Sequence, residues 1–184
     1  MSSNNNTSKR IFVGISIPEA LVGNISAFCS NIPELIKVKL DYPHITLRFL
    51  GNVLTNKILS LTEAVKEIEF SSFELTLEGV GFFGSRSPSV IWVGVRENDD
   101  LLLFKKQLDP VLDPFAEKPS GTFTPHITLK RLRRDPNADF FKSMEDFKNK
   151  SFGSFRVSSF TVFESILGPS GARHLPLAKV NSVN

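Results

Sequence analysis

One cysteine, one tryptophan, one tyrosine and three histidines are all that this 184-residue chain has of those residue types. A lone Cys29 excludes an internal disulfide and fits a reducing compartment, so we expect a cytoplasmic protein. No apolar run approaches the ~18 residues of a membrane-spanning helix, and we expect no membrane partner. The first nine residues are polar with no apolar run behind them. This pattern indicates a disordered tail over 1–9 and not a signal peptide.

The overall composition is that of an ordinary soluble globular protein. Hydrophobic residues make up 41% of the chain and charged residues 22%, which argues against disorder, collagen and coiled coil. The 22 lysines and arginines exceed the 19 acidic residues by a margin that permits an anionic partner without requiring one. Seventeen phenylalanines are assigned mainly to the core, because Phe has no polar group to satisfy. The length fits a single domain, which we place over residues 10–180.

Hydrophobic periodicity alternates between strand and helix patterns along the chain. Strand patterns occupy 10–17, 38–40, 44–50, 73–80, 89–95, 126–132, 154–163 and 173–178. Helix patterns follow Pro18, begin again at Thr55, and cover 99–108 and 137–148. The loop over 81–88 is too short for a parallel crossover, so the strands on either side of it should be antiparallel. We expect an α+β fold with helices on the outer faces of mainly antiparallel sheets.

A repeated tetrapeptide is the most informative feature of the sequence. His-Ile-Thr-Leu occurs at 44–47 and again at 126–129, about half the chain apart, and each copy follows a proline. Side chains alternate between the two faces of a strand, so each histidine shares a face with the threonine two residues later. If the two halves pack about a pseudo-twofold axis, the imidazoles of His44 and His126 face each other across a cleft.

Two facing imidazoles suit a reaction in which one proton is taken up and another is given away. With an ordinary pKa of ~6.5, one ring can be neutral and the other protonated near neutral pH. A neutral ring deprotonates an attacking water and a protonated ring donates to the leaving oxygen. The hydroxyls of Thr46 and Thr128 donate hydrogen bonds to the anionic oxygens. A phosphodiester fits these requirements, but the identical motifs do not reveal which histidine is the acid.

At these motifs the chain resembles the two-histidine (2H) phosphoesterase superfamily with its paired His-x-Thr-x motifs, and in particular the 2′-5′ RNA ligase or RNA 2′,3′-cyclic phosphodiesterase branch. The matching segments are 10–15, 44–51, 79–83, 90–95, 124–131 and 163–173. The resemblance implies a bilobal, duplicated α+β fold, with two mainly antiparallel sheets, outer helices and a central cleft on a pseudo-twofold axis. It also implies hydrolysis of a 2′,3′-cyclic phosphate on RNA to a 2′-phosphate without metal or other cofactor, together with reversible 2′-5′ joining of RNA.

The same resemblance assigns roles to individual residues. It implies that His44 protonates the 3′-oxygen leaving group, that His126 activates water, and that Arg131 contacts phosphate. Strand alternation instead places Lys130 on the face of His126 and Thr128, so both basic residues stay candidates. Arg48 is in phase with His44 and is expected at the mouth of the cleft.

Three further residues lie near the expected site without a firm role. The glycine-flanked loop offers Phe83 and Arg86 as contacts for a terminal nucleotide. His174 stands where the family often has a tyrosine, on an expected edge strand, and a surface position is favoured for it.

Alternatives remain for the chemistry and for the partner. Neither motif has a second histidine or a carboxylate at the spacing of a zinc site, so we expect no metal. The expected partner is RNA with a 2′,3′-cyclic phosphate end, with tRNA halves as one such RNA, bound by a monomer. The competing hypotheses are an RNA-end binding protein with little turnover, and an enzyme acting on ADP-ribose cyclic phosphate or on 2′-5′ oligonucleotides.

Overall fold

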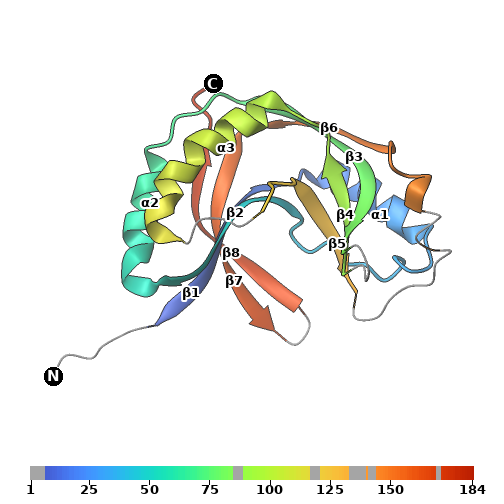
Figure 1. The fold of residues 1–184 in the computed structure, drawn as a ribbon, viewed down its shortest axis with the longest axis horizontal. Coiled ribbons are helices and arrows are strands. Elements are labelled where there is room, and N and C mark those ends of the chain that lie inside the picture. Colours follow the sequence, from blue (N-terminus) through green and yellow to red (C-terminus); the bar gives the residue numbers. More distant parts are fainter. Residues whose placement is uncertain (1–6, 85–88, 117–120, 133–139, 141–143, 169–170) are drawn as a thin grey trace.

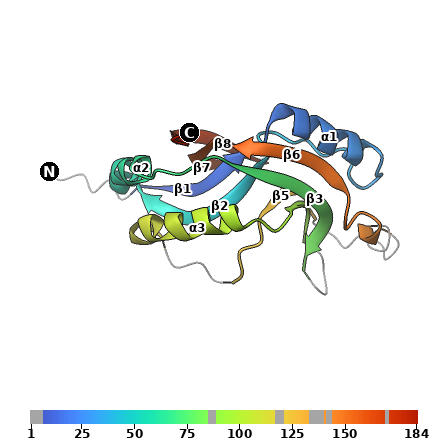
Figure 2. The same cartoon turned by 90° about the horizontal axis from the view of Figure 1, so that it is seen from above.

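The computed structural model describes residues 7–84, 89–116, 121–132, 140, 144–168 and 171–184. Its strands are β1 (Ser8–Ser16), β2 (His44–Leu54), β3 (Phe73–Phe83), β4 (Val90–Val95), β5 (His126–Arg131), β6 (Ser151–Val157), β7 (Ser159–Gly168) and β8 (Gly171–Asn181). The helices are α1 (Glu19–Ser30), α2 (Ile58–Lys66) and α3 (Asp99–Leu112), with short 3-10 helices η1 (Thr55–Lys57) and η2 (Asp113–Phe115). Figures 1 and 2 show α2 and α3 beside each other at one end of the molecule and α1 at the other.

The strands form one antiparallel sheet in the order β6-β3-β4-β5-β2-β1-β7-β8. Within the described ranges, β2 and β5 are joined at the middle of the sheet by one residue pair, Ile45 opposite Ile127. The order outward from this joint is β2-β1-β7-β8 on one side and β5-β4-β3-β6 on the other. The expected α+β, bilobal fold is confirmed. The two expected sheets are halves of one sheet, because the two repeated motifs pair with each other.

Burial explains why these segments form the strands and helices. β1 is buried at every position from Ile11 to Ile15 and lies inside the sheet between β2 and β7. The described part of the chain has no helix long and apolar enough to cross a membrane.

Cys29 lies on the buried stripe of α1, and burial raises the pKa of its thiol to about 11. The thiol therefore stays protonated, which agrees with a structural cysteine.

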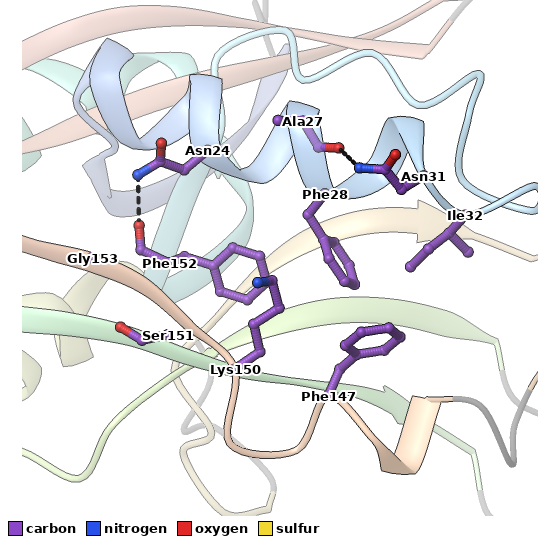
Figure 3. Close-up of a pocket in the computed structure, with 10 residues that line it drawn as sticks. All are labelled: Asn24, Ala27, Phe28, Asn31, Ile32, Phe147, Lys150, Ser151, Phe152 and Gly153. Carbon is purple, nitrogen blue, oxygen red and sulfur yellow. Dashed lines mark hydrogen bonds between the residues drawn. The ribbon is translucent and has the colours of Figure 1, made fainter.

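Helix α1 covers β6, the edge strand of the half-sheet that contains β5 (Figure 3). The Phe28 ring packs edge-on against Phe147 and Phe152, with ring centroids 4.9 and 5.2 Å away. The Asn24 amide donates to the carbonyl oxygen of Phe152 over 2.9 Å. Gly153 has φ +114, and a Cβ there would come 2.7 Å from a methyl carbon of Leu21. A helix from the first half of the chain thus closes the core under β6, which belongs to the second half.

The phenylalanines are concentrated in the core, as expected. Phe104 of α3 lies 4.8 Å from Phe70 and 5.3 Å from Phe160 between ring centroids, beneath α2 and α3. The fully or nearly buried phenylalanines are Phe12, Phe28, Phe70, Phe73, Phe104, Phe140, Phe152, Phe155, Phe160 and Phe163. Phe49 differs from these, because its side chain is 45% exposed.

Several expected boundaries are wrong. Residues 38–40 form no strand. The strand expected to end at Gly51 runs on to Leu54, because Gly51 adopts φ +73 and passes an irregularity in the pairing with β1. β3 extends to Phe83, into the expected loop. α3 continues beyond Leu108 to Leu112 with Pro110 inside it, because a proline near the end of a helix removes only one backbone bond before the helix stops.

The segment 154–163 is not one strand but parts of two. The chain leaves β6 at Val157 and enters β7 at Ser159. β6 pairs with β3 in one half of the sheet, whereas β7 pairs with β1 and β8 in the other. Of the expected tail over 1–9, residues 1–6 lie outside the described residues, while Ser8 and Lys9 already belong to β1. Half of the helix expected over 137–148, residues 137–139 and 141–143, also lies outside them.

Candidate active site

A cleft of about 570 Å³ lies where the two half-sheets meet. His44 and Thr46 from β2 and His126 and Thr128 from β5 all line it. The joint between Ile45 and Ile127 lies directly beside both histidines, and both isoleucine side chains are fully buried. The alternation expected for the repeated tetrapeptide therefore holds in both copies: the aliphatic residues enter the core and the polar residues face one cleft.

Both imidazoles are held in the same way by the backbone. Nδ1 of His44 lies 3.0 Å from the carbonyl oxygen of Tyr42, and Nδ1 of His126 lies 2.8 Å from that of Thr124. A carbonyl oxygen only accepts, so each ring carries a proton on Nδ1 and has Nε2 free for the cleft. Tyr42 adopts φ +55, a conformation uncommon for residues other than glycine. The turn before β2 thus aims the carbonyl at His44.

The surroundings of the two rings favour their neutral forms. The His44 ring stacks on Phe12 with 4.6 Å between centroids. The pKa of His44 is lowered to about 4, chiefly by burial; the Tyr42 carbonyl opposes this shift, and the neighbouring His174 and His126 add to it. Burial also lowers the pKa of His126, the Thr124 carbonyl opposes this shift, and the Arg131 cation adds to it. Hydrophobic neighbours thus favour the uncharged form of both imidazoles.

Aromatic side chains support each histidine from the same half-sheet. Phe163 of β7 stacks on Phe12, with centroids 5.0 Å apart, behind His44. In the other half, Phe83 meets the His126 ring edge-on at 4.8 Å. Phe83 was expected in a loop contacting the nucleotide, but the structure places it at the end of β3 against a site histidine. Arg86, its expected companion, lies outside the described residues.

A bulge in each strand decides which basic residue faces the cleft. Opposite β2, Val13 pairs with Arg48 and Gly14 with Thr46, so Leu47 is an extra residue. Opposite β5, Ile91 pairs with Lys130 and Trp92 with Thr128, so Leu129 is the extra residue. A bulge shifts the alternation by one position. The fifth residue after each histidine therefore returns to the cleft, and the two residues concerned, Phe49 and Arg131, both line it.

The expectation that Arg48 faces the cleft mouth is wrong for the same reason. Its side chain is buried, and Nη1 lies 3.2 Å from Oδ1 of Asp109 and 2.7 Å from Oδ1 of Asp113. Lys130, in the equivalent position of β5, donates to the carbonyl oxygen of Glu34. Each basic residue thus contacts a segment from the other half of the sequence: Arg48 contacts the helical segment between β4 and β5, and Lys130 contacts the connection between α1 and β2. Of the two candidates for a phosphate contact, the cleft holds Arg131.

Sequence reasoning missed two parts of the cleft. His174 of β8 lines it, although a surface position was favoured. Its ring lies 4.9 Å from that of His44, between centroids. Arg10 and Lys39 bring further positive charge to the same lining, and the Arg10 guanidinium lies 4.4 Å above the Phe49 ring centroid. The order of the strands β2, β1, β7 and β8 brings His174 to the cleft, and the sequence pattern does not reveal this order.

A second cavity, of about 680 Å³, lies between α1 and β6 (Figure 3). Its lining includes Phe28, Phe147 and Phe152, with Lys150 beside the last of them. Among its described lining residues there is no histidine and no carboxylate. It therefore lacks an acid–base pair, and the cleft between the half-sheets is the candidate active site.

Comparisons with known proteins agree with this geometry. The family model of the 2′-5′ RNA ligase superfamily matches residues 18–168. The RNA 2′,3′-cyclic phosphodiesterase of Archaeoglobus fulgidus is 30% identical over 166 residues, 88% of this chain and 94% of that protein. The protein of the same name from Thermotoga maritima is 30% identical over 181 residues, 93% and 92% of the two chains.

Solved structures show the same fold. Escherichia coli LigT in complex with 3′-AMP superposes with a TM-score of 0.77 at 27% identity, over 96% of this chain and 99% of LigT. LigT has also been solved in complex with phosphate, and that structure superposes with a TM-score of 0.72 at 26% identity over 97% and 99% of the two chains. With the family model matching most of its length and two His-Thr pairs in one cleft, the chain belongs to the 2′-5′ RNA ligase superfamily of two-histidine phosphoesterases.

Proposed function

We propose that this protein is an RNA 2′,3′-cyclic phosphodiesterase that opens a terminal 2′,3′-cyclic phosphate to a 2′-phosphate. The observation that carries the proposal is the pair of imidazoles in one cleft, each with Nδ1 held by a backbone carbonyl and Nε2 left for substrate. Relatives at 30% identity over most of the chain have this name. Both lines of support point to hydrolysis of a phosphodiester by acid–base catalysis.

His126 acts as the general base. Its neutral ring accepts a proton from water at Nε2 as the water attacks phosphorus. The Arg131 cation lowers the pKa of His126, which favours the neutral form that a base requires. The same cation attracts the phosphate, so one residue both attracts the substrate and keeps the base ready.

His44 acts as the general acid toward the 3′-oxygen. A ring whose Nδ1–H is bonded to Tyr42 must also carry a proton on Nε2 in order to donate there. The pKa of His44 in its buried position is about 4. A bound phosphodiester brings a negative charge next to the ring, which raises that pKa and favours the protonated form. Substrate binding thus prepares the acid.

Thr46 and Thr128 donate hydrogen bonds to the non-bridging phosphate oxygens as negative charge builds up on them. Each lies two residues beyond its histidine on the same strand face and lines the same cleft. The hydroxyls are fixed on strands, so they need little reorganisation during the reaction. No step in this scheme uses a metal or an organic cofactor.

The proposed partner is RNA carrying a 2′,3′-cyclic phosphate end, tRNA halves included. Arg10, Lys39 and Arg131 give the cleft lining a positive charge that attracts the RNA backbone. We place the protein in the cytoplasm as a monomer, with its two active-site halves in one chain. For 2′-5′ joining at the same site, the 5′-hydroxyl of a second RNA takes the place of the attacking water: it gives its proton to His126 and bonds to phosphorus, the bond from phosphorus to the 3′-oxygen breaks with protonation by His44, and a 2′-5′ linkage remains.

The test is to incubate the pure protein with a short RNA ending in a 2′,3′-cyclic phosphate, with and without EDTA, and to identify the product by 31P NMR. A 2′-phosphate formed at the same rate under both conditions is expected. Binding of the RNA without any product would replace the enzyme by an RNA-end binding protein. ADP-ribose cyclic phosphate and 2′-5′ oligonucleotides run in parallel identify a different substrate if either is turned over faster.

A further inference from the structure

His174 gives the cleft a third imidazole. It lies on β8 opposite Ser165 of β7, and both residues line the cleft. Its ring centroid is 4.9 Å from that of His44 with an interplanar angle of 82°, and 4.9 Å from that of Phe12 with an angle of 83°. The strands β2, β1 and β8 thus place His44, Phe12 and His174 in one ring cluster on the cleft face of the sheet.

The surroundings of His174 determine where its proton lies. Nδ1 is buried and has no hydrogen-bond partner among the residues that the structure describes. Buried N–H groups without an acceptor are rarer in proteins than acceptors without a donor. A proton on Nε2 leaves Nδ1 as an unprotonated acceptor and avoids the buried N–H. Burial also lowers the pKa of His174, so the ring is neutral and has one N–H donor, at Nε2.

The phosphate of a bound substrate must lie next to this ring. His44 donates from Nε2 to the leaving oxygen, which requires that oxygen within about 2.6–3.2 Å of Nε2. The remaining phosphate oxygens then surround the same end of the His44 ring. A ring in edge contact with His44, on a neighbouring part of the same cleft, adjoins these oxygens.

We propose that His174 is a substrate-binding residue that donates its Nε2–H to a non-bridging phosphate oxygen. The inference rests on the proposed function, because His44 positions the phosphate. A neutral donor suits this position: a second cation beside His44 would oppose the protonation that His44 needs as the acid. His174 thus adds to phosphate binding without competing for the catalytic proton.

The test compares His174→Phe and His174→Gln with wild type. Phenylalanine keeps a planar ring and the contacts with Phe12 but loses the donor, whereas the glutamine amide supplies a neutral N–H. Arg173→Gln is the matched control, because Arg173 is the exposed neighbour on β8 outside the cleft lining. Dissociation constants for adenosine 2′-monophosphate and for inorganic phosphate are measured by titration, along with the melting temperature of each variant.

We expect His174→Phe to raise the dissociation constants of both ligands by roughly tenfold or more, as for loss of a hydrogen bond to a charged group. His174→Gln should recover most of the affinity, and Arg173→Gln should match wild type. Unchanged phosphate affinity in His174→Phe would overturn the proposal, as would equal losses in the phenylalanine and glutamine variants at unchanged stability. If wild type binds neither ligand and does not hydrolyse cyclic phosphate RNA, the proposed function itself fails; a silent His174→Phe in an active wild type removes only the role of His174.

Discussion

Ile45 of β2 and Ile127 of β5 form the one residue pair between these two strands within the described ranges, and each directly follows a site histidine. Both side chains are fully buried. The joint therefore does two things at once: it closes the core between the half-sheets and fixes the separation of the two imidazoles. The candidate active site lies where the two copies of the repeated tetrapeptide meet.

Replacing either histidine should abolish most turnover and leave the fold intact. We expect His44→Ala and His126→Ala each to lower kcat by about 10²–10⁴-fold, the usual contribution of one positioned proton transfer. Turnover of cyclic phosphate RNA and the melting temperature are measured on the same samples. Activity near the wild-type level in both variants would contradict the acid–base scheme.

Arg48 and Arg131 should separate stability from activity. Arg48→Met removes a buried cation from Asp109 and Asp113, and we expect a loss of about 2 kcal/mol in the free energy of unfolding, as for hydrogen bonds to charged groups. The folded variant should keep kcat/KM within a few-fold of wild type. Arg131→Met should do the reverse, lowering kcat/KM roughly ten- to hundredfold through lost phosphate attraction with little change in stability.

Urea unfolding and steady-state kinetics on both variants check this pair. If Arg48→Met lowers kcat/KM as much as Arg131→Met does while remaining folded, the assignment of Arg48 to the interior side of the bulge is wrong.

Gly81 tests the support beneath His126. A Cβ on Gly81 of β3 would come 2.4 Å from the ring of Trp92, which lies 6.3 Å from the His126 ring between centroids. Gly81→Ala should cost about 1–3 kcal/mol of stability through overpacking and lower kcat as His126 shifts. Gly23→Ala is the control, since a Cβ at Gly23 in α1 meets nothing within 4 Å, and it should gain about 0.5–1 kcal/mol. Equal effects of the two substitutions would contradict the packing argument.

Stability should depend on pH through His44. Its pKa is about 4 in the folded protein against an ordinary 6.5, so between these values the unfolded chain binds the proton that the folded protein refuses. The contribution is fully present above pH 6.5 and is lost as the pH falls toward 4. His44→Phe removes the group, so its free energy of unfolding should fall less than that of wild type between pH 7 and pH 4.5. A wild-type curve parallel to that of His44→Phe would show that the ring is not buried as described.

The sequence pattern predicts what depends on local alternation. His44 and Thr46 share the cleft face because they are two positions apart on a strand, and the buried stripe of α1 follows from helical spacing. Arg48 could not be placed in this way, because the bulge at Leu47 arises from the pairing with β1. At Ser158 the apolar alternation shifts by one position, from Phe155 and Val157 to Phe160 and Val162. This shift does not reveal that the chain passes from one half-sheet to the other.

His174 shows the same limit at the level of topology. Its strand is an edge strand, as expected, but the face that it presents joins the cleft because β8 follows β7, β1 and β2 in the sheet. No property of the residues around 174 reports which strands lie beside them. Contacts that depend on the order of the strands in the sheet thus cannot be predicted without the structure. Contacts that depend on spacing along one strand can be predicted from the sequence.

The most direct test is a crystal structure of the protein with a nucleoside 2′-phosphate bound. The account predicts the phosphate between the two half-sheets, with Nε2 of His44 and Nε2 of His126 each within about 2.6–3.2 Å of a different phosphate oxygen. A phosphate that touches one histidine alone, or that binds outside this cleft, would contradict it.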